Sequence, residues 1–342
     1  IGWGKKETQF HGSAGKQAAL SKVVVVESLS DCDTLKASVA WRGEHFVVSS
    51  VDQAGRARRL RVFNRSGELL STGEPVSKVE HPLTWNPDVN IIASTCKNVK
   101  GERQVIFYER NGLRHYEFTL RRSCPVKKLQ WNADGSILTV LFDDGVVNLW
   151  TCLNYQWQLK AEFSNSHYQP FEELWWNPES ASDLWMASKD GVKNMSVFRY
   201  ISSTAEGLAT TAVIDGTTIH LTPFAIANVP PPMSLIQLTV TNVPQSVTVI
   251  GDSLLVDFED RFEKYHVDGA SQMVQMVYEY EQSDVQERTQ YSQADSRLRI
   301  VVDDQTAVIY DENDNGTIIE IPCFAAEIDV FDAFESHDGS MK

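Results

Sequence analysis

The sequence repeats itself with a period of about 45 residues. Four tryptophans, Trp41, Trp85, Trp131 and Trp176, are separated by 44, 46 and 45 residues. Each ends a strand-like run, which is followed by a polar turn and then by an apolar run of strand length, as in PLTWNPDVNIIAST (82–95). This period constrains the fold more than any other feature, because it indicates an array of similar supersecondary units.

A second aromatic residue follows each tryptophan at a nearly fixed distance. Phe63, Phe107 and Phe198 lie 22 residues after their tryptophans, and Trp150 lies 19 residues after its own. The runs around them alternate apolar and polar residues or are rich in β-branched residues, which is typical of strands. Dipeptides that favour tight hairpins lie between the runs: Ser66-Gly67, Asn111-Gly112, Asp144-Gly145 and Asp190-Gly191.

Repeats of this length with four short strands each predict an all-β fold, a β-propeller of the WD40 kind. A single blade of a propeller is a small twisted sheet that cannot bury both of its faces by itself. Its neighbours cover them, so we interpret the repeated aromatic residues as packing between blades and not as contacts to a ligand.

Beyond Tyr200 the repeat weakens, but strand patterns continue. The segment 213–224 predicts a hairpin around Asp215-Gly216, and the prolines at 230–232 predict a linker, because proline cannot donate a hydrogen bond to a sheet. The four clear repeats leave room for three more blades, so a single seven-bladed ring is possible. The alternative, which we favour, places the later blades of one propeller in 1–227 and the opening blades of a second in 228–342.

The distribution of charge supports two different units. The net charge of the 342-residue chain is −15, yet residues 1–200 carry 25 basic and 22 acidic side chains, whereas 201–342 carry 6 and 24. Hydrophobic residues make up 42% of the chain, which is ordinary for a globular protein and argues against wholesale disorder. From Phe324 the sequence is an acidic tail in which we expect little order.

No run approaches the ~20 apolar residues that a bilayer span needs, so we expect no membrane crossing. The sequence begins with Ile1 and shows no signal-peptide pattern, and we expect a piece of a longer protein. The five cysteines, Cys32, Cys96, Cys124, Cys152 and Cys323, include no Cys-x-x-Cys pair. We interpret them as buried free thiols in a reducing compartment, and hence expect an intracellular protein.

Signatures of catalysis and of metal or cofactor binding are weak. The segment 12–16, GSAGK, resembles a phosphate loop but lacks its first glycine and the Ser or Thr after the lysine. The carboxylate doublets 143–144 and 303–304 would point to opposite faces of a strand, so we interpret them as turn caps or solvated edges. The sequence therefore predicts no catalytic, cofactor-binding or metal-ligating residue and no cofactor.

Two basic clusters remain as candidates for contact with phosphate groups. Arg56, Arg58, Arg59 and Arg61 form the first, and Arg121, Arg122, Lys127 and Lys128 form the second. Such clusters can bind nucleic acid by releasing counterions, but they can equally protect edge strands from pairing with other chains. We favour the second interpretation, because no aromatic stacking platform lies among these residues.

An ordered series of phrases resembles one known family. GWGKKETQFHGSAGKQAA (2–19), VFNRSGELLSTGEPV (62–76), FYERNGLRHYEFTL (107–120), LWTCLNYQWQLK (149–160) and NVPPPM (228–233) occur in the order found in the propeller region of the Elongator scaffold subunits. These are the largest subunits of the Elongator complex, also called IκB-kinase-complex-associated proteins. The match covers about 230 residues and fades after Met233.

The resemblance implies a non-catalytic scaffold that supports modification of the transfer RNA wobble uridine, with the chemistry carried by a separate subunit. It implies the other Elongator subunits as protein partners, contact with transfer RNA only through the complex, and homodimerisation through a region outside this segment. It also implies a cytoplasmic location, with a nuclear pool as a further option. The alternative function is a general WD40-type adaptor for another intracellular complex.

Overall fold

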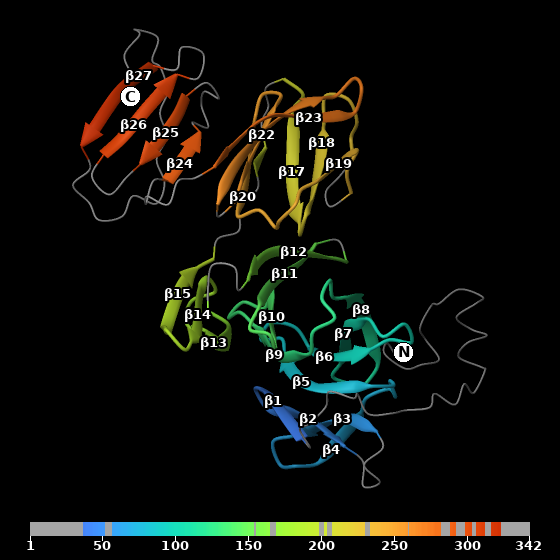
Figure 1. Cartoon of the computed structure of the whole chain (residues 1–342). Helices are drawn as coiled ribbons and strands as arrows, with labels where there is room; N and C mark the ends of the chain where they lie inside the picture. The colour runs from blue at the N-terminus through green and yellow to red at the C-terminus, as the bar shows by residue number, and fades with distance from the viewer. Residues whose placement is uncertain are drawn as a thin grey trace. The chain divides into compact units, whose positions relative to one another are not determined.

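The computed structural model describes residues 37–51, 57–153, 155–164, 169–197, 202–203, 207–229, 233–258, 260–281, 288–291, 298–302, 306–311 and 316–322. These residues form seven antiparallel sheets, in each of which the strands follow one another in chain order (Figure 1). The chain divides into two compact units, Ile1–Cys152 with Glu162–Phe198 and Leu153–Ala161 with Arg199–Lys342. No helix long and apolar enough to span a membrane occurs in the described part.

The first unit contains the four repeats found in the sequence. Its first sheet has β1 (Ala37–Arg42), β2 (His45–Val51), β3 (Arg58–Asn64) and β4 (Leu69–Thr72), and the second has β5 (Val79–Trp85), β6 (Ile91–Lys97), β7 (Arg103–Glu109) and β8 (Arg114–Thr119). The third consists of β9 (Val126–Trp131), β10 (Ile137–Phe142), β11 (Val147–Leu153) and β12 (Gln156–Phe163), and the part of β12 up to Ala161 is grouped with the second unit. The fourth has three described strands, β13 (Phe171–Trp176), β14 (Asp183–Ser188) and β15 (Gly191–Ser196).

The second unit has three sheets of four strands. They are β16 (Ser202–Ser203), β17 (Thr210–Asp215), β18 (Thr218–Pro223) and β19 (Ile236–Thr239); then β20 (Ser246–Ile250), β21 (Ser253–Asp257), β22 (Arg261–Asp268) and β23 (Met273–Glu281); then β24 (Arg288–Tyr291), β25 (Leu298–Val302), β26 (Thr306–Asp311) and β27 (Gly316–Pro322). The first two of these sheets share one apolar core, which includes Ile219, Leu221, Leu254 and Val256.

Each sheet is a blade, and the repeated tryptophans occupy the same place in the four blades of the first unit. Each tryptophan lies at or next to the end of the first strand of its blade. The second aromatic residue lies on the third strand of the first three blades, as Phe63, Phe107 and Trp150. Phe198 lies outside the described residues. The predicted hairpin turns are also present, since Gly67, Gly112, Gly145, Gly191 and Gly216 all have positive φ.

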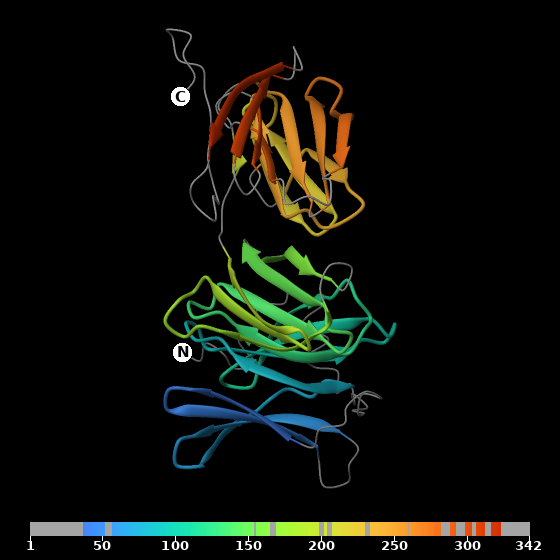
Figure 2. The ribbon, with the colours of Figure 1, turned by 60° about the vertical axis from the view of Figure 1, so that its left-hand side comes forward.

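Three of the four tryptophans are buried between blades, as the sequence predicts. Trp85 is 5% exposed and packs with Val47, Leu60 and Val62 of the preceding blade. The Trp131 ring centroid lies 6.3 Å from that of Phe107, again on the preceding blade. Trp176 donates from Nε1 to Thr139 Oγ1 at 2.8 Å. Figure 2 shows sheets of the first unit layered on one another. The contacts of Trp85, Trp131 and Trp176 place these side chains between successive sheets.

Trp41 differs from the other three, because its side chain is 62% exposed. Its blade is the first in the described part of the chain, and no described blade precedes it. Packing between blades is therefore confirmed for the other three tryptophans but not for Trp41.

The residue after each of the first three tryptophans links its blade to the next one. Asn86 Nδ2 donates to Gly135 O at 2.8 Å, and Asn132 Nδ2 donates to Ala181 O at 2.9 Å. After Trp41, Arg42 takes this position, and its Nε donates to Pro87 O at 3.2 Å. Acceptor and donor lie 45 to 49 residues apart in these three bonds, one repeat along the chain. The Trp-Asn and Trp-Arg pairs, which recur with the same period, are the signal of these links in the sequence.

Replacing Asn132 by alanine should lower the free energy of unfolding of the first unit by about 1–3 kcal/mol, because buried backbone groups lose their partners. Asn132 is 1% exposed, and its Oδ1 also accepts hydrogen bonds from the N–H groups of Ser136 and Ile137. Asn177→Ala is the matched control, because in the described part of the chain Asn177 Nδ2 donates within its own blade, to Asp183 Oδ2 at 3.4 Å. Urea unfolding measures both changes, and equal losses would contradict the proposed link between blades.

The described residues do not extend to every feature expected from the sequence. The proline segment 230–232, the doublet 303–304 and the tail from Phe324 lie outside them. The boundary at 227/228 stays a prediction. The two compact units divide after Phe198, and the hairpin formed by β17 and β18 belongs to the second unit.

Asp257 in the second unit gives a pH dependence that can be measured. Burial raises the pKa of its carboxyl to about 7, opposed by a hydrogen bond from Ser246. Because the folded-state pKa is raised, the folded state retains the proton longer than the unfolded chain, and stability falls as the pH rises from about 4 to about 7.

Asp257→Asn should therefore flatten this decline and make the protein more stable than the wild type at pH 8, by about 1–2 kcal/mol after allowance for partial exposure. Urea unfolding of the variant and the wild type measures this difference in stability. We choose about pH 4.5 and about pH 8, which lie below and above the folded-state titration of the Asp257 carboxyl. The same difference between variant and wild type at both pH values would contradict the assignment to this carboxyl.

Candidate interaction surfaces

The first basic cluster does not form a continuous cationic surface. Arg58 is 2% exposed, and its Nη1 donates to Ser49 O at 3.0 Å within its own blade. Arg61 Nη1 donates to Ser50 Oγ at 3.0 Å, and Arg56 lies outside the described residues. Consecutive strand residues point to opposite faces of a sheet, so this arginine run is divided between two faces. The interpretation of all four as a protected surface edge is wrong for Arg58.

Two cations of the second cluster are held by carboxylates. Arg122 pairs with Asp144, and its Nη1 lies 3.8 Å from Glu162 Oε1. Lys128 Nζ lies 2.5 Å from Glu173 Oε1 on the next blade. Arg121 and Lys127 are exposed. Half of the cluster therefore stabilises the packing of loops and blades, and its capacity to bind phosphate is smaller than the sequence suggests.

The two carboxylates respond to these cations. Partial burial opposes ionisation of Asp144, but hydrogen bonds from Arg122 and from the Val146 N–H lower the pKa of its carboxyl. Burial likewise opposes ionisation of Glu173, and the hydrogen bond from Lys128 lowers its pKa. Asp144 lies in the turn between β10 and β11, and accepts from Val146 N at 3.2 Å. This matches the predicted role of the doublet 143–144 as a turn cap.

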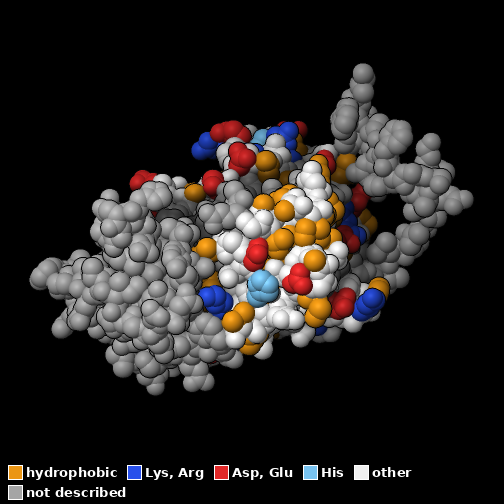
Figure 3. All heavy atoms as spheres, turned by 90° about the horizontal axis from the view of Figure 1, so that it is seen from above, with side chains coloured by type: hydrophobic (Ala, Val, Ile, Leu, Met, Phe, Trp, Pro, Cys, Tyr) orange, Lys and Arg blue, Asp and Glu red, His pale blue; other side chains and the backbone are white. Residues whose placement is uncertain are grey.

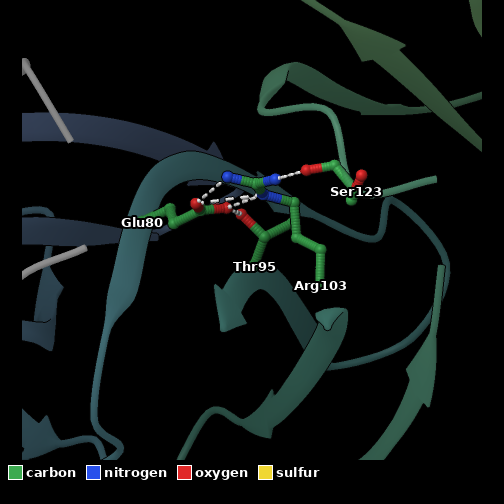
Figure 4. Close-up of polar contacts among 4 residues, drawn as sticks. All are labelled: Glu80, Thr95, Arg103 and Ser123. Carbon is green, nitrogen blue, oxygen red and sulfur yellow. Dashed lines mark hydrogen bonds and ion pairs between the residues drawn. The ribbon is translucent and has the colours of Figure 1, made fainter. Parts of the chain in front are cut away.

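A buried ion pair connects the strands of the second blade (Figure 4). Glu80 on β5 and Arg103 on β7 are 3% and 1% exposed. Arg103 Nη2 lies 2.8 Å from Glu80 Oε1, and Arg103 Nε lies 3.0 Å from both carboxylate oxygens. Thr95 on β6, between them, donates from Oγ1 to Glu80 Oε2 at 2.8 Å. The remaining Arg103 nitrogen, Nη1, donates to Ser123 O in the loop before β9.

This network has the form of a structural element. The fork of the Arg103 guanidinium matches the carboxylate in two parallel hydrogen bonds, which is the strongest arrangement for such a pair. Its last contact fixes the loop that precedes the third blade. The pair has no signal in the sequence, because Glu80 and Arg103 lie 23 residues apart and no motif joins them.

The described cysteines differ in burial. Cys96 is 2% exposed, and burial raises the pKa of its thiol to about 12. Cys124 is half-buried, and its pKa is also raised, mainly by burial, whereas Cys152 is exposed. Cys32 and Cys323 lie outside the described residues. The interpretation of the cysteines as buried thiols is confirmed for Cys96 and wrong for Cys152.

In the native protein a maleimide should label Cys152 at least about tenfold faster than Cys96, because the thiolate is the reacting species and both burial and the raised pKa suppress it at Cys96. Mass spectrometry of peptides after brief labelling at neutral pH measures the two rates. Labelling in urea serves as the control, since both thiols then become accessible. Similar native rates would contradict the described burial.

Several hydrophobic side chains are exposed on the second unit. They include Phe224, Ile226, Met233, Met273, Met276 and Val277. Figure 3 shows one face of the molecule, on which hydrophobic side chains lie among acidic ones. Single exposed apolar residues are normal on a soluble protein, but patches of them mark surfaces for protein partners.

A second exposed aromatic group lies on the fourth blade of the first unit. Trp175 and Trp185 are 38% and 36% exposed, and their rings are nearly parallel with centroids 6.5 Å apart. They lie opposite each other on β13 and β14. Because Trp176 next to them points to the preceding blade, this pair lies on the other face of the sheet.

A shallow groove of about 340 Å³ lies on the second blade. Its lining includes Glu109, Arg110 and His115, and His115 Nδ1 lies 3.4 Å from Glu109 Oε1. Both signs of charge are present, so the groove favours no class of ligand. Among the described residues, no group of three or more His, Cys, Asp or Glu side chains could hold a metal ion. The segment 12–16 lies outside the described residues.

Comparison with known proteins assigns the two parts of the chain. The family model described as "ELP1 first N-terminal beta-propeller" matches residues 1–179, and "ELP1 N-terminal second beta-propeller" matches residues 213–319. These matches confirm the all-β propeller fold, with blades of one propeller followed by blades of a second.

Curated relatives agree with the family models. "Putative elongator complex protein 1" of Xenopus laevis is 40% identical over 253 residues, which cover 68% of this chain and 21% of the relative. "Elongator complex protein 1" of Oryctolagus cuniculus is 37% identical over 270 residues, 72% of this chain and 20% of the relative. The Saccharomyces cerevisiae protein of that name is 36% identical over 276 residues, which cover 68% of this chain and 20% of the relative. The chain thus spans about a fifth of the length of these relatives.

Among solved structures, the Cps50 (Swd1) β-propeller domain of Myceliophteria thermophila is 10% identical and covers 84% of this chain and 86% of that chain, with a TM-score of 0.34. At that score the likeness adds nothing to the assignment.

Proposed function

The chain belongs to the family of Elongator complex protein 1, and we propose that it acts as a non-catalytic scaffold segment of the Elongator complex. In this role it supports modification of the transfer RNA wobble uridine by organising the catalytic subunit and its partners. The observation that carries the proposal is the order of the two family models, first propeller and then second propeller, along one chain.

The described side chains are consistent with a scaffold. Glu80 and Arg103, two deeply buried charged groups of the first unit, are paired with each other and join strands of one blade. Arg122 and Lys128 are likewise paired with carboxylates. Exposed apolar side chains, by contrast, are available for protein partners: the pair Trp175 and Trp185 on the first unit and the methionines of β23 on the second. The arrangement favours contacts with proteins over the binding of small substrates.

Direct contact with RNA is not part of the proposal. In the second cluster Arg122 and Lys128 are paired with carboxylates, and the second propeller segment is strongly acidic in sequence. Acidic surfaces repel phosphate backbones. We therefore propose that transfer RNA is reached through other subunits, that the protein dimerises through a region outside this segment, and that it acts in the cytoplasm, with nuclear action as a further option.

Affinity purification of the full-length protein from its host, followed by mass spectrometry, tests the assignment of partners. The proposal predicts the remaining Elongator subunits as the dominant partners, at amounts comparable to the protein itself. A different set of dominant partners would favour a general WD40-type adaptor. For the RNA part of the proposal, nucleoside analysis after depletion of the protein should show less modified wobble uridine.

A further inference from the structure

Four turns of the second unit meet at one end of its first two blades. They precede β17 (207–209), follow β18 (224–227), join β20 to β21 (251–252) and join β22 to β23 (269–272). Ala225 N donates to Leu208 O at 3.1 Å, and Leu208 N donates to Asp252 Oδ1 at 3.0 Å, so hydrogen bonds connect three of them. These turns lie at the ends of strands. The surface that they form is therefore distinct from the faces on which blades pack against one another.

Apolar side chains gather on this surface. A Cβ atom on Gly269 would lie 2.1 Å from Ile226 Cδ1 and 2.9 Å from Leu208 Cδ2, so both side chains lie directly over the backbone of the last turn. Phe224 and Ile226 are 39% and 45% exposed, and Met273, which follows the same turn, is 52% exposed. Leu208 packs against the apolar core of the unit, which supports the surface from below. We call Leu208, Phe224, Ile226 and Met273 the end patch.

The end patch is flanked by carboxylates. Asp252 lies in the turn after β20 and is exposed, and Asp268 ends β22. Hydrogen bonds from the Ser271 hydroxyl and from the N–H groups of Ser271 and Ala270 lower the pKa of the Asp268 carboxyl, which is therefore ionised at neutral pH. The four turns contain no lysine, arginine or glutamate. Figure 3 looks onto this end of the unit, where hydrophobic side chains lie beside acidic ones.

The negative charge selects among the possible occupants of the end patch. Nucleic acids and anionic membranes present phosphate groups, which acidic surfaces repel. A second copy of this chain would bring the same two aspartates together in one interface, because a symmetric contact pairs a surface with itself. Residues 201–342 carry 6 basic and 24 acidic side chains, so this part of the chain offers little positive charge of its own. A protein that presents apolar side chains beside lysine or arginine is complementary to both features.

We propose that the end patch is a docking surface for a protein partner whose contact segment carries apolar side chains flanked by lysine or arginine. Phe224 and Ile226 make the apolar contact, and Asp252 and Asp268 pair with the cations of the partner. Apolar anchors with charged groups around them are typical of protein interfaces. The inference rests on the proposed scaffold function, and it adds a place on the second unit and a chemistry for one partner.

Photocrosslinking of the full-length protein in its host tests the proposal. The photoreactive analogue p-benzoylphenylalanine is incorporated in place of Phe224, and crosslinked peptides are identified by mass spectrometry. We expect one dominant crosslink, to a protein segment in which apolar residues lie next to lysine or arginine. The same analogue in place of Tyr155, an exposed aromatic residue away from the four turns, should not give this crosslink.

Two variants test the charges and the apolar contact separately. Asp252→Asn combined with Asp268→Asn removes both charges but keeps the side-chain oxygens that accept from the turns, and it should lower the crosslink yield about fivefold. Gly269→Ala should also lower the yield, because the added Cβ displaces the Ile226 side chain. Glu172→Gln is the matched control, since it neutralises an exposed carboxylate on β13 and should leave the yield unchanged.

A crosslink to RNA, to lipid, to a second copy, to another part of this chain or to a protein segment without basic residues would overturn the proposal. So would the absence of a crosslink at position 224, or a yield that the two asparagine substitutions leave unchanged. Copurifying Elongator subunits are a separate readout in the same samples. If they are present without the crosslink, the docking surface alone is wrong. If they are absent while the crosslink forms, the proposed function is wrong and the docking surface stands.

Discussion

Replacing Arg103 by methionine should lower the free energy of unfolding of the first unit by about 3–5 kcal/mol, because it leaves the Glu80 carboxylate buried without its cation. Glu80 is 3% exposed. Its carboxylate accepts hydrogen bonds from Nε and Nη2 of Arg103 and from Oγ1 of Thr95. The substitution also removes the donor to Ser123 O, which fixes the loop before the third blade. Urea unfolding followed by fluorescence of the buried tryptophans measures the loss.

The double variant Arg103→Met, Glu80→Leu is the control that separates a lost ion pair from a general packing defect. Removing both charges eliminates the uncompensated carboxylate, and such replacements are often neutral or stabilising. We therefore expect the double variant to recover most of the stability that the single variant loses. Arg103→Met losing less than about 1 kcal/mol, or a double variant at least as unstable as the single one, would contradict the role given to this pair.

The second large effect should come from the layer between the second and third blades. Trp150→Ala removes an indole that is 2% exposed and lies against Phe118 with ring centroids 4.8 Å apart. Loss of a buried aromatic side chain leaves a cavity and typically costs about 3–5 kcal/mol. We expect a loss in this range, with unfolding that remains cooperative for the first unit.

Tyr155→Ala is the matched control, because Tyr155 is an aromatic residue in the turn between β11 and β12 and is 82% exposed. Its removal should change the stability by less than about 0.5 kcal/mol, as is usual for surface positions. Comparable losses at Trp150 and Tyr155 would mean that the repeated aromatic residues do not form the layers between blades.

The repeat predicted the architecture because propeller blades place the same residue type in the same structural position. Trp85, Trp131 and Trp176 are buried at the end of the first strand of their blades, and Gly67, Gly112 and Gly145 have the positive φ that their turns require. Both features depend on local sequence and on a constant spacing, so they could be read without coordinates. Asn86 and Asn132, directly after their tryptophans, followed the same spacing and could have been predicted as links between blades.

Features that depend on contacts across the sequence could not be predicted in this way. Whether a cation is free depends on a carboxylate one repeat away, as in the pair of Lys128 with Glu173. Arg58 appeared to belong to a surface cluster, yet its strand phase directs it to the buried face with Leu60. Composition suggested buried thiols throughout, but Cys152 lies on an exposed position of β11. In each case the pairing or burial of the side chain depends on residues that are distant in the sequence and become neighbours only in the folded structure. A local motif does not show them.

Nucleoside mass spectrometry of transfer RNA tests most directly the proposed role of the two propeller segments in an Elongator scaffold. The full-length protein would be depleted in its host and then re-expressed, with modified wobble uridine quantified at each stage. We expect modified wobble uridine to fall on depletion and to return on re-expression. Modified wobble uridine that stays at its normal level after depletion would contradict it.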